Sequence, residues 1–64
     1  MKVNGKNQLI NINQNLLDFL ESNQYDITKI AVERNGEIIP KLMYRQVNLK
    51  ENDTLEIVSF VGGG

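Results

Sequence analysis

The sequence predicts a two-layer α+β fold in which one amphipathic helix packs on one face of a mixed sheet of four to five strands. Two Asn-Gly pairs, each lying between short stretches that suit strands, indicate β-hairpins. Residues 14–22 place apolar side chains at helical spacing, and Thr54–Phe60 alternates as a strand does. A chain of 64 residues has room for one small domain. We expect this domain to span residues 1–61, followed by a flexible glycine tail at residues 62–64.

The first hairpin is predicted at Asn4-Gly5. A type I′ turn needs positive φ at both central residues, and Asn followed by Gly suits these positions. The turn is expected to join a short strand at Met1–Val3 to a second strand at about Gln8–Ile12.

The predicted helix runs from about Gln14 to Ser22. Asn13 is its expected N-cap, because its side-chain oxygen can accept a bond from an N–H group of the first turn. Asn23 is expected to end the helix in a left-handed conformation. The apolar stripe toward the sheet consists of Leu16, Leu17 and Leu20.

The second hairpin is predicted to pair Lys29–Arg34 with Glu37–Ile39 through a turn at Asn35-Gly36. Pro40 ends the later strand, and because proline cannot donate to a ladder, this strand suits a sheet edge. Lys41–Val47 is expected to be a loop with one helical turn. The predicted element order is therefore ββαββ(turn)β.

The last strand follows a turn at Asn52-Asp53. Its alternation directs Leu55 and Ile57 toward the helix and leaves Val58 and Phe60 on the open face of the sheet. Exposed apolar side chains beside a protruding tail favour a partner-docking surface over two ordinary exposed residues.

The composition excludes several classes of function. With no cysteine and no histidine, the chain has no disulfide, no triad or Cys-His pair for nucleophilic catalysis, and no metal site of the usual ligands. The net charge is −1 and the seven basic residues are scattered, so we expect no nucleic-acid binding. No apolar run approaches the roughly 20 residues of a membrane helix. We expect a cytoplasmic protein that is monomeric when free.

The carboxylates of Glu33 and Glu37 flank the second hairpin turn and could approach each other. Paired carboxylates can serve in acid–base catalysis. Exposed hairpins commonly carry such charges for solubility alone, and we favour that interpretation. The chain is therefore expected not to be an enzyme on its own.

The sequence ends in Gly62-Gly63-Gly64, directly after an apolar strand. The only functional group that such a tail presents is the α-carboxylate of Gly64, and glycine can thread a channel too narrow for other residues. A frayed or added terminus accounts for the tail alone equally well.

The whole chain resembles the ThiS family, the sulfur carriers of thiamine (thiazole) biosynthesis. The residues that carry the resemblance are Leu16-Leu17, the segment Ile30–Pro40 with its Asn-Gly turn, and the segment Asn52–Gly64 with its diglycine end. One departure is Asn52, where the family usually has Gly, but Asn tolerates the left-handed conformation.

The resemblance implies a ubiquitin-like β-grasp fold whose first and last strands pair in parallel at the sheet centre. It also implies that an E1-like adenylating enzyme (ThiF type) uses ATP to activate the Gly64 carboxylate. A sulfur donor protein then converts it to a thiocarboxylate, and a thiazole synthase (ThiG type) takes the sulfur. Gly62 and Gly63 would allow entry into both active sites, Val58 and Phe60 would dock, and the carrier itself would bind no cofactor.

Two alternatives stay open at this point. One is a sulfur carrier for molybdopterin, tRNA thiolation or another sulfur pathway, although those chains tend to be longer. The other is a non-covalent β-grasp interaction module with an incidental glycine tail.

Overall fold

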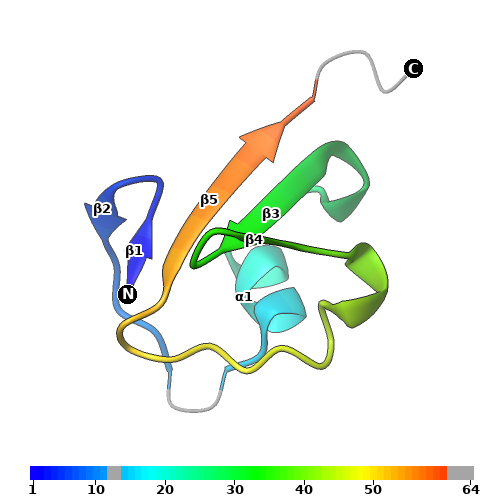
Figure 1. Ribbon diagram of the computed structural model, residues 1–64. Coiled ribbons are helices and arrows are strands. Elements are labelled where there is room, and N and C mark those ends of the chain that lie inside the picture. The colour runs from blue at the N-terminus through cyan, green and yellow to red at the C-terminus, as the bar shows by residue number, and fades with distance from the viewer. Residues whose placement is uncertain (12–13, 61–64) are drawn as a thin grey trace.

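The computed structural model describes residues 1–11 and 14–60. These residues form a five-stranded mixed sheet with one α-helix packed against it (Figure 1). The sheet order is β2-β1-β5-β3-β4. The predicted fold class and element order are confirmed. The strands are β1 (Lys2–Val3), β2 (Lys6–Asn7), β3 (Ile30–Arg34), β4 (Glu37–Ile39) and β5 (Thr54–Ser59).

The central strand is β5, which pairs in parallel with β1 and antiparallel with β3. Because β1 ends at Val3, it covers only the beginning of β5. The side-chain amide of Asn4 extends the hydrogen bonding of β1 along β5 as far as Ile57. Its Oδ1 accepts from the Ile57 N–H at 2.7 Å, and its Nδ2 donates to the Ile57 carbonyl at 3.2 Å. An asparagine side chain thus takes the place of a peptide unit beside the middle of β5.

The role of Asn4 leads to a testable difference between two substitutions. Asn4 has φ 51°, a conformation that glycine adopts freely and alanine does not. Asn4→Gly removes only the two side-chain bonds and is expected to cost about 1–2 kcal/mol. Asn4→Ala adds backbone strain and should cost about 1 kcal/mol more. Urea unfolding of both variants measures this difference, and equal stability would contradict the strained conformation.

The two Asn-Gly turns have the predicted positive φ angles, 51° and 84° in the first and 52° and 87° in the second. The predicted second strand, however, was wrong in position. Because a two-residue turn pairs Val3 with Lys6, β2 begins directly after Gly5. The Gln8 N–H donates to the Met1 carbonyl at 2.8 Å just past the end of β2, and residues 9–11 lie outside the sheet.

The helix α1 (Leu16–Ser22) starts two residues later than predicted. Its N-cap is Asn15, whose Oδ1 accepts from the Asp18 N–H at 2.8 Å; the predicted cap, Asn13, lies outside the described residues. The predicted left-handed stop is displaced by one residue. Asn23 has φ −97° and bonds back to the Phe19 carbonyl, whereas Gln24 takes the positive φ of 63°.

The core lies between α1 and the covered face of the sheet. Of the predicted stripe, Leu16 and Leu20 are fully buried, but Leu17 is only partly buried and Phe19 takes its place. The segment after β4 also enters the core through Tyr44 and Leu49, which the sequence did not indicate. The buried apolar residues are Val3, Leu16, Phe19, Leu20, Ile30, Val32, Tyr44, Leu49, Leu55 and Ile57.

The segment between β4 and β5 begins with the short 3₁₀ helix η2 (Lys41–Met43), as predicted. It then crosses the start of α1, where the Leu16 N–H donates to the Val47 carbonyl at 2.8 Å and the Leu17 N–H to the Tyr44 carbonyl at 3.1 Å. First-turn N–H groups have no partner inside their own helix. The crossing segment satisfies two of them and so fixes where α1 begins.

Candidate functional site

The strand β5 positions the residues before the glycine tail. Its neighbours on both sides hold it in the middle of the sheet, and the Phe60 N–H donates to the Lys29 carbonyl at 2.8 Å just past the strand end. Phe60 is the last residue that the structure describes. The predicted sulfur attachment residue Gly64 and the predicted entry residues Gly62 and Gly63 lie outside the described residues.

The alternation predicted for β5 is present. Leu55 and Ile57 are buried against the helix side, whereas Val58 is 60% exposed and Phe60 is 47% exposed. Ile38 on β4, 74% exposed, adds a third large apolar side chain that the sequence reasoning missed. The sequence could have indicated this exposure. Ile38 and Ile39 are neighbours in a strand, and successive side chains point to opposite faces, so one of the two must face away from the helix.

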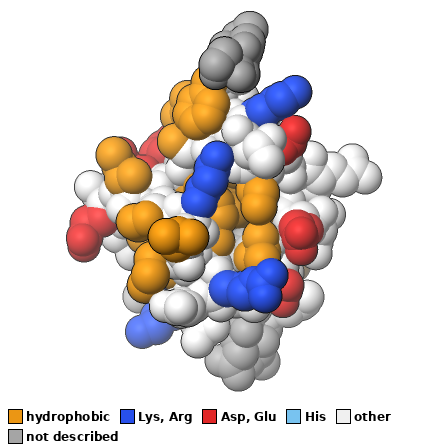
Figure 2. Space-filling view, turned by 90° about the vertical axis from the view of Figure 1, so that its right-hand side faces the viewer, with side chains coloured by type: hydrophobic (Ala, Val, Ile, Leu, Met, Phe, Trp, Pro, Cys, Tyr) orange, Lys and Arg blue, Asp and Glu red, His pale blue; other side chains and the backbone are white. Residues whose placement is uncertain are grey.

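Hydrophobic side chains gather among charged ones on the face of the molecule that Figure 2 shows. On the open face of the sheet, a groove of about 280 Å³ separates Ile38 from Val58. Glu33 and Glu56, at matched positions in β3 and β5, also line it. Glu37, the other carboxylate considered from the sequence, lies opposite Arg34 in the hairpin, so Glu33 and Glu37 are not cross-strand partners. The groove is therefore mainly apolar, with two carboxylates along its wall.

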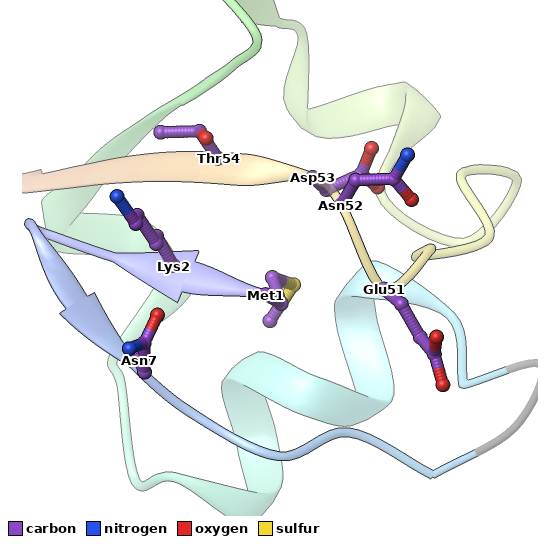
Figure 3. A pocket seen from close by; sticks show the side chains of 7 residues that line it. All are labelled: Met1, Lys2, Asn7, Glu51, Asn52, Asp53 and Thr54. Atoms are coloured by element: carbon purple, nitrogen blue, oxygen red, sulfur yellow. The ribbon is translucent and has the colours of Figure 1, made fainter.

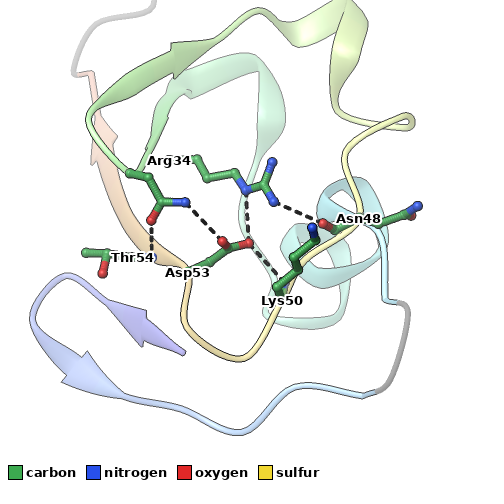
Figure 4. Close-up of polar contacts among 6 residues, drawn as sticks. Arg34, Asn48, Lys50, Asp53 and Thr54 are labelled. Carbon is green, nitrogen blue, oxygen red and sulfur yellow. Dashed lines mark hydrogen bonds and ion pairs between the residues drawn. The ribbon is translucent and has the colours of Figure 1, made fainter.

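The opposite end of β5 is fixed by the buried carboxylate of Asp53 (Figure 4). Its Oδ2 accepts from Arg34 Nε and from the Lys50 N–H, both at 2.9 Å, and its Oδ1 accepts from Asn35 Nδ2 at 3.0 Å. Asn35 also bonds to Thr54 through its side chain and its backbone. These bonds join the second hairpin turn to the start of β5.

The environment of Asp53 determines its charge. Burial raises the pKa of this carboxyl. The hydrogen bonds from Asn35, Lys50 and Arg34, together with the Arg34 charge, lower the pKa by more than burial raises it. The net result is a pKa below the ordinary value of aspartate. Asp53 is therefore ionised and fully bonded near neutral pH, as suits a structural carboxylate rather than an acid–base catalyst.

A second open groove, of about 270 Å³, lies beside Asp53 at the start of β5 (Figure 3). The polar ends of Lys2 and Glu51 point away from each other in this view. Because the Asp53 carboxylate is already occupied by three donors, the groove offers no set of converging groups for chemistry.

Within residues 1–11 and 14–60, no three carboxylates lie close enough together to hold a metal ion. In the same part of the chain, no helix has the length and hydropathy needed to cross a bilayer.

The chain is similar to known proteins over its whole length. The model of the ThiS family matches residues 1–64. The sulfur carrier protein ThiS of Bacillus subtilis is 51% identical over 47 residues, which cover 73% of this chain and 71% of that protein. A thiazole synthase of Paramagnetospirillum magneticum is 42% identical over 62 residues, which cover 97% of this chain but only 19% of that protein.

A solved structure supports the same assignment. The crystal structure of the thiamine biosynthesis protein ThiS from Geobacter metallireducens superposes with a TM-score of 0.83 at 27% identity, covering 98% of this chain and 96% of that one. The shared architecture is the ubiquitin-like β-grasp, with the first and last strands parallel at the sheet centre. On these grounds the chain belongs to the ThiS family.

Proposed function

We propose that this chain is a sulfur carrier of thiamine biosynthesis and that the carboxylate of Gly64 carries the sulfur. The observation that carries the proposal is the sequence Gly62-Gly63-Gly64, which follows the central strand of a ThiS-family fold after two further residues. With no histidine or cysteine in the sequence, the chain has no Ser-His or Cys-His pair for nucleophilic catalysis. It acts as the co-substrate of other enzymes.

The chemistry begins with activation, since a carboxylate is a poor electrophile. A carboxylate oxygen of Gly64 attacks the α-phosphorus of ATP in an adenylating enzyme of the ThiF type, and pyrophosphate leaves. The terminal sulfur of a donor persulfide then attacks the acyl carbon, and AMP leaves. A second thiol attacks the resulting S–S bond, which forms a disulfide with the donor and releases the Gly64 thiocarboxylate. ATP is thus used by the partner and is not a cofactor of the carrier.

The anchoring of β5 suits this role. Backbone bonds hold the chain as far as Phe60, and four residues follow it. Four extended residues reach about 13 Å, far enough to place a terminal carboxylate in a recessed nucleotide site. Gly62 and Gly63 present no side chain that would block a narrow entrance.

The relatives support a thiazole synthase as the acceptor of the sulfur. In the Paramagnetospirillum magneticum thiazole synthase, a stretch similar to this chain makes up about a fifth of the protein. A second thiazole synthase, from Magnetococcus marinus, is 47% identical over 36 residues. Occurrence of the two parts in one polypeptide is expected when the parts work together, and we extend this partnership to the present chain.

Sulfur transfer by a C-terminally tagged chain tests the proposal. A peptide bond to the tag removes the Gly64 carboxylate, so the tagged, uncleaved protein should support no thiazole formation in a mixture of activating enzyme, ATP, sulfur donor, thiol, and thiazole synthase with its other substrates. Cleavage that leaves Gly64 as the last residue should restore it. Full activity of the uncleaved protein would overturn the assignment of Gly64.

We also propose that Val58 and Phe60 dock against the activating enzyme. Val58→Asp or Phe60→Ala is expected to weaken that binding about tenfold or more, because buried apolar anchors dominate interface energies. Both residues are largely exposed in the free chain, so its stability should change by no more than about 1 kcal/mol. The matched control is Ile57→Ala, on the other face of the same strand, which should cost about 2–5 kcal/mol of stability. Titration calorimetry and urea unfolding separate the two effects, and unfolding by Val58→Asp would contradict the docking role.

A further inference from the structure

Two glutamates face each other across the open side of the sheet. Glu33 in β3 and Glu56 in β5 are direct cross-strand partners, and both side chains line the open-face groove. Cross-strand partners have Cβ atoms about 4.5–5.5 Å apart, and like charges at such positions destabilise a sheet. The free chain thus holds an unfavourable charge pair next to its proposed docking surface.

The described part of the fold does not neutralise this pair. Among residues 1–11 and 14–60, the ion pair that forms is between Arg34 and Asp53. The Arg34 guanidinium is also bonded to the Asn48 carbonyl, away from Glu33 and Glu56. Neither glutamate accepts a hydrogen bond from another side chain in this part of the structure. Both carboxylates remain available to a cation from outside.

The rest of the groove is apolar. Val58 lies opposite Ala31 and Ile38 lies opposite Glu33, and all three apolar residues line the groove. The groove volume of about 280 Å³ is just below the range of about 300–1,000 Å³ typical of small-molecule pockets. A shallow groove with apolar sides and acidic groups suits one long basic side chain better than a cofactor.

We propose that this groove receives an arginine side chain of the thiazole synthase when the carrier docks, an inference that rests on the proposed function. A guanidinium group is planar and has five donors, so it can bond to Glu33 and Glu56 together. The apolar stem of arginine would lie against Val58 and Ile38. Val58 is common to the groove and to the docking surface that leads to Phe60. The arginine stem would therefore lie next to the docking surface on β5.

Binding of the thiazole synthase to charge-neutralised variants tests the inference. The double variant Glu33→Gln/Glu56→Gln should bind at least about tenfold more weakly at low ionic strength, since hydrogen bonds to charged groups are strong. The difference should shrink with added salt. The matched control Glu21→Gln/Glu51→Gln changes the net charge equally but lies outside the groove, and it should bind like the unmodified sequence.

A stability measurement separates docking from a structural role. Removing the like-charge repulsion should raise the melting temperature of Glu33→Gln/Glu56→Gln by about 2–4 °C. A variant that is more stable yet binds more weakly supports the inference. A variant that melts lower would show that the glutamates stabilise the sheet and would overturn it.

Chemical modification identifies the occupant. Phenylglyoxal treatment of the thiazole synthase, which blocks arginine, should weaken binding of the unmodified chain but not weaken binding of Glu33→Gln/Glu56→Gln any further. An effect of lysine acetylation alone would overturn the arginine assignment. Equal binding of the double variant and the unmodified sequence would overturn the groove inference and leave the proposed function intact. Failure of the unmodified chain to bind the synthase at all would overturn both.

Discussion

Deletion of Gly64 is expected to lower the rate of thiocarboxylate formation about a hundredfold or more, with no loss of stability. The deletion moves the terminal carboxylate inward by about 3.5 Å. A displacement of only about 1 Å can cost about a hundredfold in a reaction that depends on positioning. Single-turnover assays with the activating enzyme, ATP and a sulfur donor measure the rate, and urea unfolding checks that the fold is intact.

Substitutions of Gly63 separate the effect of the length of the tail from the effect of its width. Gly63→Ala adds one methyl group, whereas Gly63→Val adds a branched Cβ that restricts the backbone as well. Both keep the carboxylate at its normal distance from Phe60. We expect a graded loss of rate, larger for valine than for alanine. A normal rate for the Gly64 deletion together with a normal rate for Gly63→Val would contradict a narrow, positioned entry site.

Asp53→Ala is expected to be the most damaging single change in the polar part of the fold, with a loss of about 2–4 kcal/mol. The substitution leaves Arg34, Asn35 and the Lys50 N–H without their shared acceptor. In a domain of this size such a loss is a large fraction of the total free energy of unfolding. Urea unfolding at pH 7 measures it. Glu51→Ala, an exposed carboxylate two residues earlier, is the control and should change stability by less than about 0.5 kcal/mol.

The contribution of Asp53 should also depend on pH. Its pKa in the folded chain lies below its ordinary value, so the unfolded chain takes up the proton first as the pH falls. The stabilisation is therefore fully present above the unfolded pKa of about 3.9 and is lost as the pH falls through the folded pKa. The stability difference between the unmodified sequence and Asp53→Asn should shrink on acidification. A difference that grows below pH 4 would contradict this sign.

The stability of the unmodified sequence must be compared with that of Asp53→Asn because Asp53 is not the only carboxyl with a lowered pKa. The pKa of Asp26 is also lowered, chiefly by the hydrogen bonds from the side chain and backbone of Thr28. Asp26 titrates in both proteins, so subtracting the two stability curves leaves the part that belongs to Asp53.

Local signals in the sequence were sufficient for the turns and for the faces of the long strands. Asn35-Gly36 fixed the second hairpin because few other residue pairs adopt two positive φ angles in succession. In β5, strict alternation separated the buried Leu55 and Ile57 from the exposed Val58. These features depend on neighbours in the chain, and the sequence describes such neighbours completely.

Features that depend on distant contacts could not be predicted. The N-cap moved to Asn15 because the segment around Tyr44 and Val47 crosses the start of the helix and bonds to its first N–H groups. Tyr44 itself is buried by that crossing, and the bounds of β2 follow from its register with β1, which pairs Val3 with Lys6.

The candidate site also combines features that the local sequence predicts with features that depend on distant contacts. The exposure of Val58 and Phe60 followed from the alternation, but the pairing of Glu33 with Glu56 depends on the register between β3 and β5. That register is set by a pairing between strands that are distant in sequence, and no local motif encodes it. The sequence reasoning accordingly considered Glu33 with Glu37 across the nearby turn.

The mass of the intact chain after reaction with an activating enzyme of the ThiF type, ATP and a persulfide donor tests the central claim most directly. The proposal predicts that one oxygen is replaced by one sulfur and that fragmentation locates the sulfur on Gly64. It also predicts that addition of the thiazole synthase and its other substrates returns the mass to its original value. An unchanged mass under conditions in which the same enzyme loads the Bacillus subtilis carrier, or sulfur located on any other residue, would contradict the account.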